Sequence, residues 1–83
     1  MKLYYFSWVR ERIGKPHEEV DLPETITTIK ELITWLEARG PEYAAAFEEK
    51  ATINAAIDQT HVDHEAPLNK AQEIAFFPPV TGG

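Results

Sequence analysis

One segment of the sequence combines a helix start signal, an apolar stripe and a helix stop signal, and it strongly limits the folds open to a chain of 83 residues. Thr28 and Glu31 have capping-box spacing, in which the threonine hydroxyl accepts the Glu31 N–H and the glutamate carboxylate accepts the Thr28 N–H. The apolar residues that follow have helical spacing, and Arg39-Gly40-Pro41 ends them: Ile29, Leu32, Ile33 and Leu36. Because so short a chain has room for one core, we expect this helix to pack its stripe there.

Strand-forming residues stand on both sides of this helix. Residues 2–9 and 17–22 precede it and are expected to pair as a hairpin-like unit, and residues 52–57 and 73–77 follow it, with a short strand near 61–62. Residues 41–47 are typical of a short second helix that begins at Pro41. This order predicts an α+β domain in which one main helix packs on one face of a mixed sheet.

The other face of that sheet carries aromatic side chains. In residues 2–9, alternation places Tyr4, Phe6 and Trp8 opposite Leu3 and Tyr5, and in the last strand Ala75 and Phe77 oppose Ile74 and Phe76. Because a solvated sheet face is normally polar, we predict that this face docks on a protein partner. The alternative is that loops or the short helix cover it.

Composition excludes several classes of function. Without cysteine the chain has no disulfide, no thiolate metal ligand and no thiol nucleophile. A net charge of −6 disfavours nucleic acid and favours a basic partner. No apolar run approaches the roughly 20 residues that span a bilayer. The apolar start of the chain is interrupted by the charged residues Arg10, Glu11 and Arg12, which argues against a signal peptide. We therefore expect a cytoplasmic protein with no membrane contact.

Polar clusters give weak signals of chemistry. The segment His61-Val62-Asp63-His64-Glu65 contains metal-ligand residue types, but it has the character of a solvated turn, so we expect no metal site and no cofactor bound by this chain. The pairs Glu18-Glu19 and Glu48-Glu49 are expected to be solvated charge, because sequence neighbours point apart on a strand or helix.

The C-terminus carries the most specific pattern. Pro78 and Pro79 stiffen the exit from the last strand, and Val80-Thr81-Gly82-Gly83 follows. Because glycine has no Cβ, such an end can thread a narrow channel with the terminal carboxylate as its reactive group; a frayed end without function is the alternative. We divide the chain into a domain at 1–77 and an extended, flexible tail at 78–83.

With this ending, the chain resembles the ubiquitin-like sulfur carrier family that includes the small subunit of molybdopterin synthase. Residues 76–83 are the specific part of the resemblance. Support comes from Lys2-Leu3-Tyr4-Tyr5-Phe6, Arg10-Glu11 with Gly14, Thr28-Ile29, Asp58-Gln59 and Ala66-Pro67-Leu68. The chain departs from the family pattern where Lys70-Ala71-Gln72 replaces an Asp-Gly-Asp turn, where His61 replaces an apolar residue, and where Asp58 replaces asparagine.

The resemblance implies a ubiquitin-like β-grasp fold and a cycle of sulfur transfer. A ubiquitin-activating-like adenylyltransferase, using ATP and magnesium bound on that partner, would adenylate the Gly83 carboxylate. A sulfur donor protein would then displace AMP and leave a thiocarboxylate. Val80, Thr81 and Gly82 would insert into the large synthase subunit, where the sulfur attacks cyclic pyranopterin monophosphate in molybdenum cofactor biosynthesis. The catalytic residues would lie on the large subunit, so this chain would be a non-catalytic sulfur donor.

The resemblance also implies a heterotetramer of two small and two large subunits. Its docking surface would include Phe6 and Phe77, together with Arg10 and His61. Three other functions remain open: a sulfur carrier for another pathway such as thiamine thiazole formation, a ubiquitin-like protein modifier, and a protein-interaction module that does not react.

Overall fold

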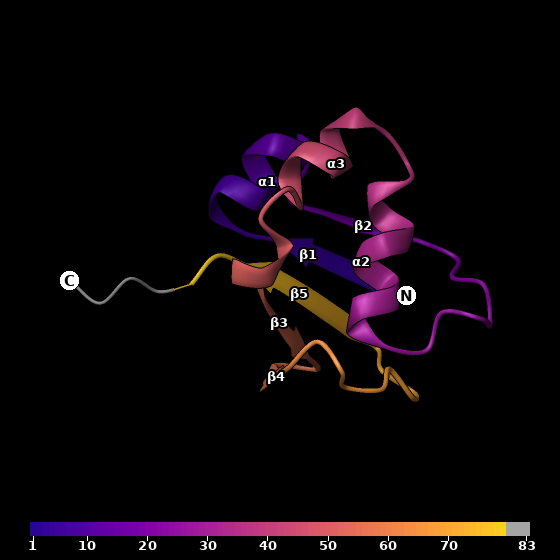
Figure 1. Cartoon of the computed structure of the whole chain (residues 1–83). Helices are drawn as coiled ribbons and strands as arrows, with labels where there is room; N and C mark the ends of the chain where they lie inside the picture. The colour runs from indigo at the N-terminus through magenta and orange to yellow at the C-terminus, as the bar shows by residue number, and fades with distance from the viewer. Residues whose placement is uncertain (80–83) are drawn as a thin grey trace.

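The computed structural model describes residues 1–79, which form a mixed sheet with helices on one side (Figure 1). The first half of the chain contains β1 (Lys2–Tyr5), α1 (Ser7–Ile13), β2 (His17–Glu19), α2 (Ile29–Glu37) and α3 (Pro41–Ala46). The second half contains the 3-10 turn η1 (Lys50–Thr52), β3 (Asn54–Ile57), β4 (Thr60–Val62) and β5 (Glu73–Phe77).

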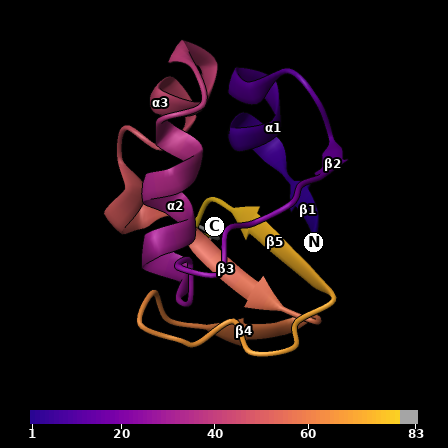
Figure 2. The same cartoon turned by 90° about the vertical axis from the view of Figure 1, so that its right-hand side faces the viewer.

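The five strands lie in the order β2-β1-β5-β3-β4, so the first and last strands of the chain are neighbours in the middle of the sheet. The β1–β5 pair is parallel, and the other three pairs are antiparallel. This arrangement confirms the predicted mixed sheet and the pairing of the first two strands. Figure 2 shows the helices grouped together, with β2 and β4 at the two edges of the sheet.

The main helix α2 forms as its sequence predicts. The Glu31 N–H donates to the Thr28 hydroxyl at 3.2 Å, and the Thr28 N–H donates to Oε1 of Glu31 at 3.1 Å, which completes the capping box. All four residues of the apolar stripe are at most 1% exposed. Burying four such side chains contributes about 1.5–3 kcal/mol each, so burial contributes more to the stability of α2 than the capping box does.

The prediction of a strand over residues 2–9 is wrong beyond Tyr5. The Phe6 N–H donates to the Phe76 carbonyl at 3.1 Å, and the chain then turns into α1, which ends at Gly14 with φ 93°. Val9 and Ile13 are four residues apart and both are buried. The β1–β5 register is complete at Tyr5, so these two side chains gain burial by forming a helix beside α3.

Trp8 is therefore not on the open face of the sheet. It is half-buried on α1, where the Arg12 guanidinium lies 4.6 Å from the centre of its ring. Two strand boundaries also differ from prediction, since β2 ends at Glu19 and β3 begins at Asn54. The shorter β2 is explained by its single neighbour, because it pairs with β1 alone over three residues.

The core lies between the helices and one face of the sheet. Leu3, Tyr5, Ala55, Ile74 and Phe76 are buried there. No helix of the described residues lies over the opposite face (Figure 1). No helix among residues 1–79 is long and apolar enough to cross a membrane.

Candidate functional site

The open face of the sheet is built by one row of side chains across the three central strands. The register aligns Tyr4 on β1 with Ala75 on β5, and Ala75 with Ala56 on β3. All three are half-buried, because no helix covers them. Phe6 continues this face beyond the end of β1, and at 46% it is the one exposed large apolar side chain in the described part of the chain.

The structure brings three of the four predicted interface residues onto this face. Phe77 is the last residue of β5, and the centre of its ring lies 5.8 Å from that of His61 on β4. His61 pairs with Ala56, which places it on the same face as Phe6. Arg10 is exposed on α1, one helical turn after Phe6, and its N–H donates to the Phe6 carbonyl at 3.4 Å. Arg10 therefore borders the face from the helix rather than from the sheet.

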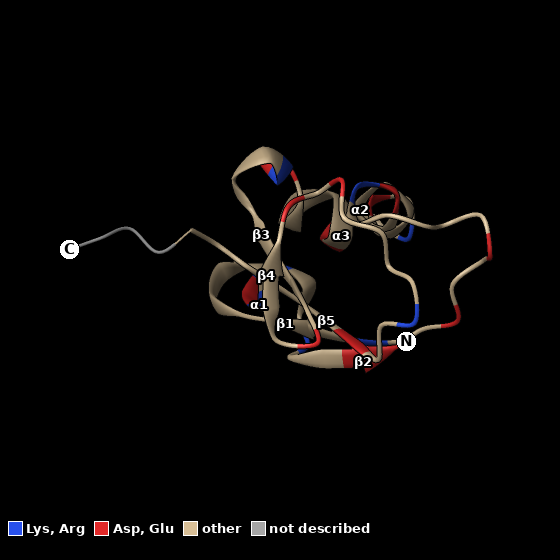
Figure 3. Cartoon of the chain, turned by 90° about the horizontal axis from the view of Figure 1, so that it is seen from below, with Lys and Arg blue, Asp and Glu red and all other residues tan. Residues whose placement is uncertain are grey.

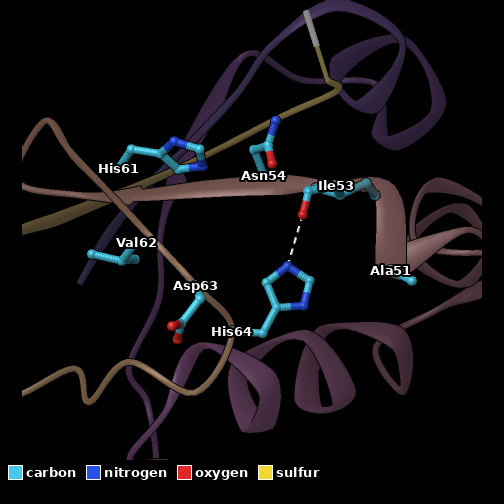
Figure 4. Close-up of a pocket in the computed structure, with 7 residues that line it drawn as sticks. All are labelled: Ala51, Ile53, Asn54, His61, Val62, Asp63 and His64. Atoms are coloured by element: carbon cyan, nitrogen blue, oxygen red, sulfur yellow. Dashed lines mark hydrogen bonds between the residues drawn. The ribbon is translucent and has the colours of Figure 1, made fainter.

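The polar segment of residues 61–65 begins within β4 and makes local hydrogen bonds. Four of its residues line one side of an open hollow of about 470 Å³, and residues around the start of β3 line the other (Figure 4). The lining residues are Ala51, Ile53, Asn54, His61, Val62, Asp63 and His64. A ring nitrogen of His64, Nε2, lies 2.7 Å from the Ile53 carbonyl, and Asp63 accepts the Glu65 N–H at 2.9 Å. Within residues 1–79 no group of three or more His, Cys, Asp or Glu side chains is placed to hold a metal ion.

Glu18 is the polar residue whose environment the sequence failed to indicate. Its side chain is only 10% exposed, so the expectation of solvated charge is wrong for Glu18. The hydroxyls of Tyr5 and Tyr43 donate to its Oε2 at 2.8 and 2.6 Å, and Arg39 donates to Oε1 at 3.1 Å. Lys15 lies 3.5 Å from the same Oε1. The signal that could have indicated this buried environment is the pairing of the first two strands, because Glu18 lies opposite buried Leu3.

The Glu18 cluster shifts the pKa values of its members. Burial acts to raise the pKa of Glu18, but the hydrogen bonds from Tyr43 and Tyr5 and the charge of Arg39 outweigh it and lower that pKa. Burial, with the hydrogen bond to Glu18, raises the pKa of both tyrosines. The cluster lies on the helix side of the sheet and connects β1, β2 and α3, so its role is structural.

The predicted tail residues Val80, Thr81, Gly82 and Gly83 lie outside the described residues. The structure does describe the strand from which they follow. Pro78 and Pro79 come directly after β5, the central strand of the sheet, next to Phe77 and to the hydrogen bond between Phe6 and Phe76. The chain therefore leaves the sheet at its middle, beside the open aromatic face.

Comparisons with known proteins agree with this geometry. The model of the ThiS family matches residues 3–83. The chain is 39% identical to the molybdopterin synthase sulfur carrier subunit of Escherichia coli and 35% identical to that of Haemophilus influenzae, in each case covering all of this chain and 99% of the relative. The corresponding subunit of Dictyostelium discoideum is 33% identical over 99% of this chain and 94% of its own length.

Solved structures give the same result for the fold. A putative molybdopterin converting factor, subunit 1, from Pyrococcus furiosus superposes with a TM-score of 0.73 at 27% identity and covers 95% of each chain. SAMP1 from Haloferax volcanii superposes with a TM-score of 0.72 at 22% identity, covering 100% of this chain and 98% of the other. These neighbours confirm the ubiquitin-like β-grasp fold.

Proposed function

The chain belongs to the ThiS family, and on that basis we propose that it is the sulfur carrier subunit of a molybdopterin synthase. The observation that carries the proposal is full-length similarity, reaching the final Gly82-Gly83, to relatives that bear this name. The proposal is further supported by the open aromatic face, which lies beside the point where the chain leaves β5. A sulfur carrier must dock on its partner while its C-terminus reaches into the active site of that partner.

The chemistry begins at the Gly83 carboxylate. A carboxylate is a poor electrophile, so an adenylyltransferase of the ubiquitin-activating type uses ATP and magnesium to form the Gly83 acyl-adenylate and release pyrophosphate. The outer sulfur of a persulfide on a sulfur donor protein then attacks the acyl carbon, and AMP leaves. A thiol cleaves the S–S bond of the resulting acyl disulfide, so that a disulfide forms with the donor and a thiocarboxylate remains at Gly83. The sulfur travels on the main-chain terminus, which is consistent with a chain that has no cysteine.

Sulfur transfer takes place on the large subunit. Residues Val80 to Gly83 enter its pocket, and the thiocarboxylate sulfur attacks cyclic pyranopterin monophosphate. Water then cleaves the acyl–sulfur bond, which leaves the sulfur on the pterin and restores the Gly83 carboxylate; two rounds build the dithiolene. Four residues can span roughly 13 Å when extended, so a docked domain can place its terminus well inside a partner. In this arrangement the large subunit supplies the catalytic residues.

The open aromatic face is the docking surface in this proposal. Phe6, His61 and Phe77 lie on it, and Arg10 borders it. An exposed aromatic flanked by half-buried apolar residues is typical of the anchor residues that dominate binding energy at interfaces. The net charge of −6 assists the approach to a basic pocket that binds an anionic tail and an anionic intermediate.

Intact mass spectrometry tests the proposal directly. The purified chain is incubated with its activating enzyme, ATP, magnesium, a persulfide sulfur donor and a thiol reductant. The expected result is the mass change for replacing one terminal oxygen by sulfur, located at Gly83 by fragmentation. A chain with Gly83 deleted is the control and should show no change.

The competing functions give different outcomes in the same experiment. A loaded chain that does not convert cyclic pyranopterin monophosphate with the large subunit would indicate a carrier for another pathway. Attachment of Gly83 to lysines of other proteins would indicate a protein modifier. An unloaded chain that still binds the large subunit would indicate an interaction module and would contradict the carrier function.

A further inference from the structure

An open hollow in the open aromatic face, the proposed docking surface, combines small apolar, aromatic and acidic side chains. It has a volume of about 360 Å³ and is lined by Tyr4, Phe6, Ala56, Gln59, Glu73 and Ala75. Ala56 and Ala75 are register partners on β3 and β5, and their small side chains leave the centre of the hollow free. Tyr4 and Phe6 supply aromatic rings on one side, and Glu73 supplies a carboxylate at the start of β5.

Glu73 is half-buried, and its carboxylate has no cationic partner in the part of the chain that the structure describes. The Gln59 amide donates to its Oε1 at 3.4 Å. Among residues 1–79 no Lys, Arg, His or N-terminal nitrogen lies within 4.0 Å of its carboxylate, since the ion pairs there are formed by Glu18 and Glu37. An apolar partner surface laid over this hollow would bury an uncompensated charge, which is costly. The surface that covers Glu73 must therefore supply a positive charge.

Neighbouring charges do not remove this requirement. Lys2 stands beside Glu73 in the β1–β5 register, and Glu19 on β2 stands on the far side of Lys2. Lys2 and Glu19 line a separate hollow with His17. The cross-strand row of Glu73, Lys2 and Glu19 therefore carries more negative than positive charge. Figure 3 shows acidic residues on β2 and at the start of β5.

The lining matches a long cationic side chain. The alanine floor can pack against the methylene stem of an arginine or a lysine, as such stems commonly pack on apolar surface. The rings of Tyr4 and Phe6 can attract the cationic head, and Glu73 can accept its hydrogen bonds. We infer that this hollow receives a cationic side chain, arginine or lysine, from the large subunit, an assignment that rests on the proposed function.

Charge-neutral variants at two positions of the same face test this inference. Glu73→Gln keeps the shape and the contact with Gln59 but removes the charge, and Glu19→Gln makes the same change outside the hollow. Affinity for the molybdopterin synthase large subunit is measured by calorimetry at low and high salt. Glu73→Gln should raise Kd by about tenfold or more at low salt, with a smaller effect at high salt, whereas Glu19→Gln should change Kd less than about twofold.

A third variant separates a cationic occupant from an apolar one. Glu73→Leu should bind at least as weakly as Glu73→Gln if the occupant is cationic, and more tightly than the wild type if the occupant is apolar. Equal effects of Glu73→Gln and Glu19→Gln, or tight binding by Glu73→Leu, would overturn the inference. Thermal unfolding of each free variant confirms that the fold is retained.

The results also separate this inference from the proposed function. If the wild type and Glu73→Gln bind equally well and both deliver sulfur, only the assignment of the hollow fails. If Phe6→Ala also binds as the wild type does, the docking face itself is wrong. If the wild-type chain does not bind the large subunit, both the proposed function and the occupant of the hollow are overturned.

Discussion

The carboxylate of Glu18 accepts hydrogen bonds from three side chains on three separate segments. Glu18→Gln would remove the charge and place an amide NH2 group against donors, so it should lower the free energy of unfolding by about 2 kcal/mol. Urea unfolding at neutral pH measures this loss. Glu19→Gln is the matched control, because the Glu19 side chain is exposed and should change stability little.

The same residue predicts a dependence on pH. The pKa of Glu18 is lowered in the folded state, so its contribution to stability is fully present above the ordinary value of 4.5 and is lost as the pH falls through the folded-state pKa. The difference in unfolding free energy between the wild type and Glu18→Gln should therefore shrink in acid below that value. A difference that stays constant between pH 7 and pH 3 would contradict the lowered pKa.

At the scale of elements, the end of α1 depends on one left-handed residue. Gly14 has φ 93°, and a Cβ added there would have no atom within 4 Å. Gly14→Ala should therefore cost about 1 kcal/mol through backbone strain alone. Thermal unfolding is the measurement, and Gly14→Asn, which tolerates this conformation better, should lose less. Equal losses for alanine and asparagine would argue against a strained backbone as the cause.

The turn between β3 and β4 is held to β5 by Asp58. Its Oδ1 accepts the N–H groups of Gln72 and Glu73, both at 2.9 Å, and its own φ is 46°. Asp58→Ala should lower stability by about 1–2 kcal/mol, because it loses the acceptor of both hydrogen bonds and places alanine in a left-handed conformation. Asp58→Asn keeps an oxygen at that position and should remain near the wild type in a urea titration. Loss of stability in both variants would show that the charge, not the acceptor, is required.

At the scale of the whole molecule, the reactive terminus and the core are separate parts. The core is built from residues between Leu3 and Phe76, and Gly83 lies outside the described residues. Gly83→Ala should therefore leave thermal unfolding unchanged while it strongly reduces loading with sulfur, as read by intact mass. Equal loading of the wild type and the variant would count against a carrier whose glycine end must enter a narrow channel.

Much of the fold was predictable from local pattern. The capping box at Thr28 and the stripe from Ile29 to Leu36 are local signals, and α2 forms as they indicate. Alternation in residues 73–77 correctly separates the buried from the open side of β5. Alternation also indicates Phe6 and Phe77, and the family resemblance implies His61, but only the β3–β4 and β3–β5 registers bring His61 next to Phe77.

The amino-acid sequence by itself determined the helix, the strand faces and the glycine ending, because caps, periodicity and chain chemistry act over a few residues. Tertiary structure alone decided that residues 7–13 form a helix, since it is packing beside α3 that buries Val9 and Ile13 together on one helix face. It also decided that Glu18 becomes a buried acceptor and that Glu73 faces an open hollow. These outcomes depend on segments distant in the chain, whose meeting no local pattern encodes.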